Sequence, residues 1–384
     1  MSPDQTQVDL KAETTMARIV KAELRLVDLK PLTERTDAIQ SFISQETPIL
    51  TLTDEDGCVG TGYTYTIGSG GSAIIALMRD HLLPRLLGMD AQEIERNWRT
   101  LLYGMHSLAV GPVSSLALAA IDIAAWDLRC RRSGLPLHQA VGGAHTRLPV
   151  YTTEGGWLHL ESDQLVEDAV SMQARGFKGA KLKIGKPRKA EDVERLTAVR
   201  QAVGDGFELM VDANQSLRLD DAQRRARLLS ELDLAWIEEP MPADDISAHT
   251  RLVASSSVPI AVGESLYSLS QFKDYMHADA CSVVQVDVAR IGGITPWLKV
   301  AHLADAYNLP VSPHFLMELH ASLACGIPNG QWVEYIPQLE SVTRSGLEVT
   351  DGYAYPSSEP GLGIDWDWNA IADLQIGEHW SIMT

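Results

Sequence analysis

The chain has 384 residues, of which 45% are hydrophobic and 22% are charged. This ordinary globular composition excludes a wholly disordered chain and allows a large buried core. The formal net charge of −19 argues against nucleic acid and anionic membranes as partners, and no run of about 20 apolar residues is present to span a bilayer. A small anionic substrate is still compatible, because one pocket can hold local cations or a metal ion.

Residues 1–16 are polar and acidic and lack the cationic flank and apolar centre of a secretory signal. We expect them to form a disordered extension ahead of the folded chain. The four cysteines lie far apart, and no pair has the spacing of a zinc knuckle or a disulfide framework. These features predict a cytoplasmic protein.

Residues 17–142 have the pattern of an α+β domain. Ile19–Asp28 alternates apolar and polar residues, as a strand with one buried face does. Ile49–Thr53 and Val59–Tyr65 are two further strand-like runs, and the acidic turn that joins them ends in glycine, which is typical of a hairpin. From Ser72 to Arg132 the apolar residues follow a helical period, which predicts helices after a small sheet.

Residues 143–355 alternate between short apolar runs and helical stretches, which predicts a parallel sheet. Eight units of about 25 residues favour a closed (β/α)8 barrel over an open sheet. The predicted strands are Leu148–Thr152, Gly179–Ile184, Glu208–Val211, Ala235–Ile237, Ile260–Val262, Val283–Val286, Pro310–Val311 and Trp332–Val333. The predicted helices include Asp163–Arg175, Ala190–Val203, Leu219–Leu232 and Leu298–Ala306.

Three acidic residues stand at the carboxyl ends of predicted barrel strands, where barrel active sites are built. Asp212, Glu238 and Glu264 are equally spaced by one strand–helix unit, so their carboxylates reach one rim on neighbouring strands. Converging carboxylates need a counter-charge, and Mg²⁺ with its oxygen ligands supplies one. The alternative, that each acid caps the following helix, explains a single acid better than three at equal spacing. Strand alternation points Glu239 away from Glu238, so we leave it out of the ligand set.

Lys181 and Lys183 lie two apart on the preceding predicted strand and therefore share one of its faces. We expect both ammonium groups to point into the barrel mouth. Their mutual repulsion and partial burial lower a lysine pKa, which makes a lysine a usable base. The alternative is two lysines that are solvated or that only neutralise the acids; the predicted metal site beside them favours a catalytic pair.

Asp287 and His314 are again separated by one strand–helix unit, at strand ends across the ring from the lysines. A carboxylate that accepts a hydrogen bond from an imidazole orients the ring and raises its basicity, so the two residues predict an acid–base pair. Among 11 histidines an arbitrary one is usually structural, but this position favours function. Glu334 ends the eighth predicted strand and either hydrogen-bonds a substrate oxygen or is a buried structural acid.

A metal site between two bases on opposite sides of a barrel mouth suits the removal of a proton next to a carboxylate. The resulting enediolate carries negative charge that a divalent cation and Lys181 can stabilise. From about Ile19 onward, the chain resembles the mandelate racemase group of the enolase superfamily. The motifs of that group are present here in the same order. They are Ala120–Asp127, Lys181–Lys183, Val211–Gln215, Trp236–Pro240, Val262–Glu264, Asp287 with Ile291–Gly293, and Ser312–His314.

The resemblance implies a modified TIM barrel, (β/α)7β-like, with an N-terminal α+β capping domain. We expect the C-terminal residues 356–384 to pack back on the capping domain. The resemblance implies Mg²⁺ on Asp212, Glu238 and Glu264. It also implies a homo-oligomer, often an octamer in this family.

The resemblance further implies roles for the other strand-end residues. Lys183 would be the base on one face of the substrate, with Lys181 beside the substrate carboxylate. His314, paired with Asp287, would act on the other face, and Glu334 would donate a hydrogen bond to the carboxylate.

Asn214 and Thr153 match positions that contact substrate in the family. Two polar cap loops, Leu32–Gln45 with Arg35 and Gly62–Gly71 with Tyr65, are expected to select the substrate; the alternative for both is an ordinary hydrated surface loop. A mostly polar first loop disfavours an aryl substrate.

Within the family, the stretches Gly155–His159 and Pro313–Glu318 look most like L-talarate/galactarate-type dehydratases. This similarity implies a Mg²⁺-dependent dehydratase of an acid sugar, an aldarate or aldonate. The same residues could return a proton to the opposite face, so a racemase or epimerase of a 2-hydroxy acid is the alternative. A non-enzymatic binding protein on a barrel is a third reading, disfavoured by acid–base groups on both sides of the metal site.

Overall fold

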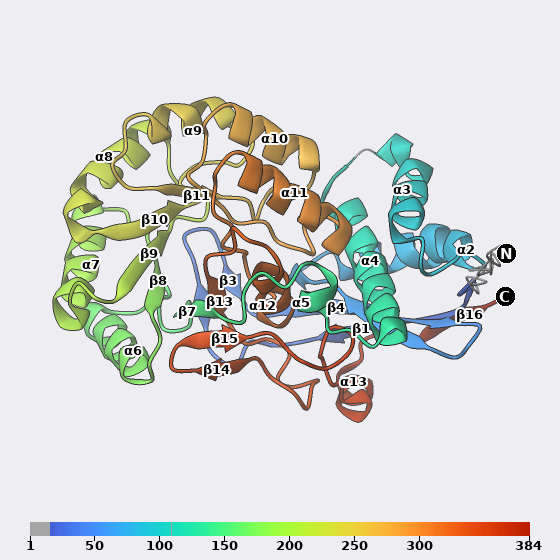
Figure 1. The fold of residues 1–384 in the computed structure, drawn as a ribbon. Coiled ribbons are helices and arrows are strands. Elements are labelled where there is room, and N and C mark those ends of the chain that lie inside the picture. Colours follow the sequence, from blue (N-terminus) through green and yellow to red (C-terminus); the bar gives the residue numbers. More distant parts are fainter. Residues whose placement is uncertain (1–15, 109) are drawn as a thin grey trace, which may run out of the picture.

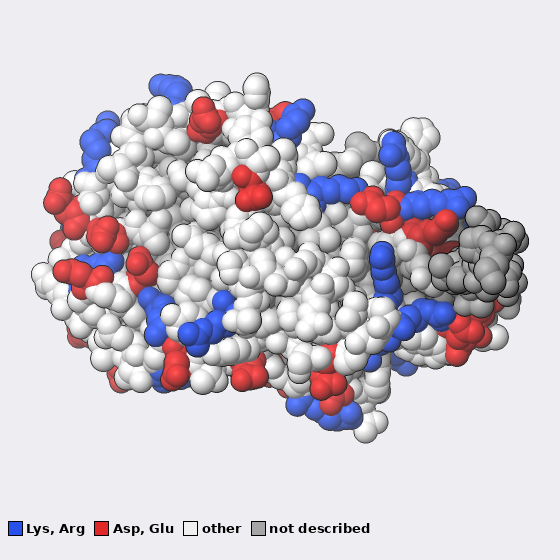
Figure 2. Space-filling view, in the orientation of Figure 1, with Lys and Arg blue, Asp and Glu red and all other residues white. Residues whose placement is uncertain are grey.

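The computed structural model describes residues 16–108 and 110–384, which form a barrel and a capping domain beside it (Figure 1). Of the predicted extension, residues 1–15 lie outside the described part of the chain. No helix in the described part is long and apolar enough to cross a bilayer. The visible face of the molecule carries scattered acidic and basic side chains around a largely uncharged centre (Figure 2).

The capping domain is built on an antiparallel sheet with the strand order β16-β1-β4-β5. Its strands are β1 (Ile19–Asp28), β4 (Gln45–Asp54), β5 (Val59–Tyr63), β6 (Thr66–Ile67), which also pairs with β4, and β16 (Trp380–Met383). The predicted hairpin is confirmed, because β4 and β5 pair across the acidic turn. A second, small hairpin, β2 (Arg35–Thr36) with β3 (Ser41–Phe42), lies in the first cap loop.

Helix α4 (Pro112–Ser133) covers this sheet and is buried along most of its length. It begins at a proline, which suits the first helical turn, and ends at Gly134 in the left-handed region (φ 68°). Gly62 of β5 allows its close approach, since a Cβ there would lie 2.2 Å from the carbonyl oxygen of Ala120. The other cap helices are α1 (Gly71–Leu77), a π-helical turn (Met78–Leu82), α2 (Leu83–Leu86), α3 (Ile94–Gly104), a 3₁₀ turn (His106–Leu108) and α5 (Leu137–Ala140).

The barrel follows the predicted alternation of strands and helices. Its strands are β7 (Leu148–Thr152), β8 (Gly179–Lys183), β9 (Glu208–Asp212), β10 (Leu234–Glu238), β11 (Ile260–Val262), β12 (Val283–Val284) and β13 (Val333–Tyr335). Its helices are α6 (Ser162–Ala174), α7 (Lys189–Val203), α8 (Leu219–Leu229) with a 3₁₀ turn (Ser230–Leu232), α9 (Ile246–Val253), α10 (Leu269–His277), α11 (Ile294–Ala306) and α12 (Met317–Gly326). Neighbouring strands pair in parallel, and β13 pairs with β7, which closes the ring.

The seventh strand position differs from the prediction. Instead of a strand at Pro310–Val311, only Val311 forms isolated bridges, to Val284 and to Gly330. Pro310 has no N–H to donate to a ladder, so the pairing there stays short. With this position, seven helices and eight strand positions occur in the described barrel, the (β/α)7β arrangement that was expected.

Helix α4 also joins the two domains. Its Asp122 accepts hydrogen bonds from the backbone N–H (2.8 Å) and the hydroxyl (2.7 Å) of Thr295 at the start of α11. Its Asp127 accepts from the backbone N–H of Leu362 at 2.8 Å. After β14 (Glu348–Thr350), β15 (Tyr353–Tyr355) and α13 (Trp368–Leu374), the chain returns to the cap, where β16 pairs with β1. Of these contacts, the pair of hydrogen bonds between Asp122 and Thr295 holds the cap against the barrel.

Candidate active site

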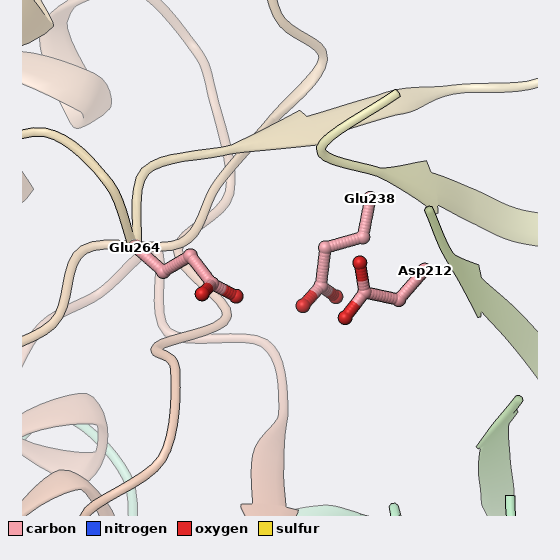
Figure 3. Close-up of side chains that lie close together, drawn as sticks. All are labelled: Asp212, Glu238 and Glu264. Atoms are coloured by element: carbon pink, nitrogen blue, oxygen red, sulfur yellow. The ribbon is translucent and has the colours of Figure 1, made fainter. Parts of the chain in front are cut away.

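Asp212, Glu238 and Glu264 converge at the carboxyl ends of three neighbouring strands (Figure 3). Each offers a carboxylate oxygen within 4.8 Å of the others, and all three side chains are buried. None of them caps a helix, since α8, α9 and α10 are capped by Arg218, Asp245 and Ser268. Three buried carboxylate donors match the oxygen ligands that Mg²⁺ prefers.

The charge balance of this cluster favours a bound cation. Burial raises the pKa of Glu238 to about 7, and the carboxylates of Asp212 and Glu334 act in the same direction against the opposing Lys181. The cluster therefore resists full ionisation until further positive charge enters it. Glu239, whose pKa burial and Glu264 raise well above its usual range, lies outside the set of converging oxygens.

Lys181 and Lys183 both point into the barrel mouth from β8, as their spacing predicts, and both are buried. The Nζ of Lys181 lies 2.6 Å from Glu238 Oε1 and 2.8 Å from Glu334 Oε1. The Nζ of Lys183 lies 2.5 Å from Asp212 Oδ2. Each ammonium group is therefore in contact with one of the three carboxylates of the candidate metal site.

The expected lowering of the lysine pKa values is wrong, because the pKa values of Lys181 and Lys183 are both raised in this structure. Burial lowers the pKa of Lys183, but the charge of Asp212, with Glu264 and Glu238, outweighs it and raises the pKa overall. Burial and, for Lys183, the repulsion from Lys181 act to lower these pKa values, but the carboxylates that contact both ammonium groups act in the opposite direction and outweigh them. A divalent cation on those carboxylates would offset the charge that holds the proton on Lys183.

His314 lines the same cavity as the two lysines and lies between two carboxylates. Its Nδ1 is 2.9 Å from Asp287 Oδ2, and its Nε2 is 3.3 Å from Glu264 Oε2. Burial lowers the pKa of His314, but the charge of Glu264 and the hydrogen bond with Asp287 raise it overall. Burial acts to raise the pKa of Asp287, yet the hydrogen bond and charge of His314 bring it down to about 2. The imidazole is thus poised to hold a proton.

Glu334 accepts three hydrogen bonds. Its Oε1 accepts from Thr153 Oγ1 at 2.5 Å and from Lys181, and its Oε2 accepts from the backbone N–H of Phe315 at 2.7 Å. Burial acts to raise the pKa of Glu334, but Lys181 and His314 lower it overall. The carboxylate is therefore an ionised acceptor here, whereas the family resemblance implies a donor.

Asn214 lies beside this cluster with its backbone in the left-handed region (φ 44°). Its backbone N–H donates to Asp212 Oδ1 at 2.8 Å. Its Oδ1 is buried and, among the residues described, without a hydrogen-bond partner. Because Asn214 also lines the cavity, this oxygen is free to accept a bond from a substrate hydroxyl.

One cavity brings the barrel groups together with side chains of both cap loops. The cap contributes Asp37, Gln40, Phe42 and Ile67; the barrel contributes Thr153, Trp157, Lys181, Lys183, Asn214, Glu264, Arg290, His314, Phe315, Glu334 and Ile336.

Two expected cap contacts lie elsewhere. Arg35 does not line this cavity; its guanidinium forms an ion pair with Glu154 and donates to the carbonyl of Pro337 at 3.0 Å. Tyr65 does not line it either; its hydroxyl donates to Asp287 Oδ2 at 2.7 Å. Both side chains are buried and already hydrogen-bonded.

Three further side chains, which the sequence did not predict as site residues, donate hydrogen bonds to the carboxylates of the candidate metal site. Gln285 Nε2 and Trp236 Nε1 donate to Glu238 Oε2 at 2.6 and 3.0 Å, and Arg290 Nη1 donates to Glu264 Oε1 at 3.2 Å. A signal was present for two of them. Gln285 and Trp236 each stand two residues before a predicted site acid, and strand alternation puts such a residue on the same face.

Comparison with known proteins agrees with this geometry. Residues 21–142 match the mandelate racemase / muconate lactonizing enzyme N-terminal domain, and residues 164–370 match the enolase C-terminal domain-like family. The L-talarate/galactarate dehydratase of Salmonella typhimurium is 38% identical over 335 residues, which cover 87% of this chain and 81% of that protein. The 3,6-anhydro-α-L-galactonate cycloisomerase of Streptomyces coelicolor is 37% identical, covering 84% of this chain and 90% of that one.

A solved structure extends the likeness to the whole fold. The L-talarate dehydratase of Polaromonas sp. JS666, complexed with Mg and L-glucarate, superposes with a TM-score of 0.91 at 34% identity over 96% of this chain and 99% of that one. The capping domain and the barrel are thus shared, and this chain belongs to the mandelate racemase / muconate lactonizing enzyme family of the enolase superfamily.

Proposed function

We propose that this protein is a Mg²⁺-dependent dehydratase of an acid sugar, an aldarate or an aldonate. The observation that carries the proposal is the placement of Lys183 and His314, two proton-transfer groups that both contact the metal-binding carboxylates from separate strand ends. Two relatives, an L-talarate/galactarate dehydratase and an L-talarate dehydratase, are 38% and 34% identical to this chain over the aligned residues. Their likeness supports the same reaction type here.

Bound by Asp212, Glu238 and Glu264, Mg²⁺ would supply positive charge that stabilises the negative charge developing on the substrate carboxylate. Lys181, beside Glu238, adds a second positive charge at the same place. In its neutral form, which the positive charge of a bound cation would favour, the amine of Lys183 takes the proton from the carbon next to the carboxylate and becomes an ammonium. The electron pair that remains on the carbon is shared with the carboxylate.

His314 completes the elimination from the other side. Its protonated imidazole donates a proton to the departing β-hydroxyl, the C–O bond breaks, and water leaves. Asp287 orients the imidazole and stabilises its charged form through the Nδ1 hydrogen bond. The enol that remains becomes a 2-keto-3-deoxy acid. Asn214 and Thr153 are proposed to hold substrate oxygens, because both line the cavity.

Proton NMR of acid sugars and 2-hydroxy acids with enzyme and Mg²⁺ in D₂O tests the proposal. The panel pairs each aldarate with the matching aldonate, so that the result also names the substrate class. A new 2-keto-3-deoxy product is the expected outcome. Loss of the α-proton signal without that product would replace dehydration by racemisation or epimerisation, and binding without α-proton exchange would make the protein a non-enzymatic binder.

We also propose a homo-oligomer and a cytoplasmic location. Large apolar side chains on the first cap loop are strongly exposed, Leu32 at 87% and Ile43 at 78%, which supports contact with a further copy of the chain. Four free cysteines suit a reducing compartment. Light scattering on the eluted protein tests the first proposal, with a single-chain mass of 42.0 kDa as the contradicting result. Cell fractionation tests the second.

A further inference from the structure

Tyr65 reaches from the capping domain into the acid–base pair of the barrel. It lies between β5 and β6, both of which pair with β4, so the cap sheet holds it from both sides. Its side chain is 2% exposed, and its hydroxyl donates to Asp287 Oδ2 at 2.7 Å, although 222 residues separate the two. The Tyr65 ring also packs on Phe315, at 4.6 Å between ring centroids.

The direction of this hydrogen bond is set by a third residue. Arg290 Nε donates to the Tyr65 hydroxyl oxygen at 3.1 Å, and a guanidinium cannot accept a hydrogen bond. The phenol oxygen is therefore the acceptor from Arg290, and its proton points to Asp287. Burial raises the pKa of Tyr65 well above its usual range, which agrees with a protonated hydroxyl.

Asp287 is held on both of its oxygens. Oδ1 accepts from the backbone N–H groups of Ala289 at 2.7 Å and Arg290 at 3.1 Å, in the turn that follows it. Oδ2 is shared between His314 Nδ1 at 2.9 Å and the Tyr65 hydroxyl. Within the described chain, Tyr65 is the one hydrogen-bond donor to Asp287 that comes from the capping domain.

The hydrogen-bond and ring contacts of the Lys183 ammonium group come from the barrel. The hydrogen-bond partner of Lys183 Nζ is Asp212, which belongs to the barrel. The ring beneath its ammonium group is Trp157, also from the barrel, at 5.5 Å. The cap packs on this ring through Phe42 at 6.0 Å between ring centroids. Among the described residues, however, it donates a hydrogen bond to the Asp287–His314 pair and makes none with Lys183 Nζ.

We propose that Tyr65 is a positioning residue that orients Asp287, and through it His314, so that proton transfer on the His314 side requires the cap to be seated on the barrel. The proposal rests on the proposed dehydratase function. It predicts that removing the Tyr65 hydroxyl changes the rates of the two steps differently. The rate of α-proton removal by Lys183 stays nearly the same, and the rate of β-hydroxyl loss assisted by His314 falls.

The test compares Tyr65→Phe with Tyr63→Phe. Tyr63 is an equally buried tyrosine two residues earlier, and its hydroxyl has no hydrogen-bond partner among the described residues. In D₂O with Mg²⁺ and the best substrate, we expect Tyr65→Phe to lower kcat for dehydration about 10- to 100-fold and to change α-proton exchange by less than about threefold. Tyr63→Phe should behave as wild type in both.

Two results would overturn the proposal. An equal fall in exchange and dehydration, or a rise in KM alone, would make Tyr65 a structural or substrate-binding residue. An unchanged dehydration rate would show that the hydroxyl does nothing for His314.

A second measurement needs no substrate and so separates this proposal from the proposed function. Protein with ¹⁵N-labelled histidine is loaded with Mg²⁺, and the Nδ1–H resonance of His314 is identified by its loss in His314→Asn. We expect this resonance to move in Tyr65→Phe and to stay in Tyr63→Phe. If wild type converts no acid while the resonance responds in this way, the proposed function fails and the positioning role stands. If the resonance is unmoved in Tyr65→Phe, the positioning role fails.

Discussion

The barrel and the capping domain contribute different kinds of side chain to the cavity. The barrel strands end in charged groups that contact one another at 2.5–3.3 Å, from Lys183 with Asp212 to His314 with Glu264. The cap loops bring mostly neutral or apolar groups, among them Gln40, Phe42 and Ile67. Strand ends are rigid and hold reacting groups in register, whereas loops adapt in shape. The difference supports the proposal that the proton-transfer groups come from the barrel and that the cap loops select the substrate.

The largest expected effect lies on the barrel side. Lys183→Ala and His314→Asn should each lower kcat for dehydration by about 10²- to 10⁴-fold, because each removes one proton-transfer group. Initial rates of 2-keto-3-deoxy acid formation measure the loss. Exposed residues of the same type, in Lys273→Ala on α10 and His302→Asn on α11, serve as controls. Full activity in either site variant would remove that residue from the mechanism.

The second-largest expected effect is a loss of Mg²⁺ affinity when one of the three carboxylates of the candidate metal site is replaced. Glu238→Gln keeps the size of the side chain but removes a charged ligand oxygen, so we expect Mg²⁺ affinity to fall about 10- to 100-fold or more. Calorimetric titration of the purified protein with Mg²⁺ measures it. Glu239→Gln changes the next residue, which lies outside the converging oxygens, and should keep its affinity. Equal loss in both variants would contradict the assigned ligand set.

A substitution in the cap tests packing without touching the site. Gly62→Ala would place a Cβ 2.2 Å from the Ala120 carbonyl oxygen and 2.4 Å from the Ala124 nitrogen. Forcing α4 away from β5 should cost about 1–3 kcal/mol of unfolding free energy. Urea unfolding measures this cost. Gly206→Ala, where the added Cβ meets nothing within 4 Å, is the control, and matching midpoints would refute the close contact.

The smallest expected effect concerns substrate choice. Asp37 is the one charged side chain that the described cap places at the cavity, and its Oδ1 accepts from the backbone N–H groups of Ile39 and Gln40. Asp37→Asn keeps that acceptor and removes the charge. About 1 kcal/mol of repulsion would then disappear, so kcat/KM for aldarates should rise about fivefold relative to aldonates.

The control for this prediction is Asp28→Asn, a cap residue whose Oδ1 also accepts locally, from Ser44 and Gln45, away from the cavity. Paired rates on galactarate and galactonate, or on glucarate and gluconate, measure the preference. An unchanged ratio would show that Asp37 does not sense the second carboxylate.

The barrel and its charged groups were predictable because their signals are local. Each site acid follows a short apolar run, and the regular spacing between successive acids matches one strand and one helix of a parallel barrel. Asp212, Glu238 and Glu264 therefore had to meet, whatever the details of the helices between them. The departures are local as well: the pairing at Val311 is shorter than expected because Pro310 lacks an N–H, and the last turn of the predicted Leu219–Leu232 helix is 3₁₀.

The amino-acid sequence by itself determined which groups line the barrel mouth, since strand period and strand order decide it. Only the tertiary structure decided how those groups are charged and what the cap adds. The pKa of Lys183 is raised by Asp212, 29 residues away along the chain, and Tyr65 donates to an aspartate 222 residues away. Both effects depend on distances of a few ångströms between side chains, which the spacing of the motifs does not give. The Tyr65 contact also requires the cap to be seated on the barrel, because no periodicity links those two segments.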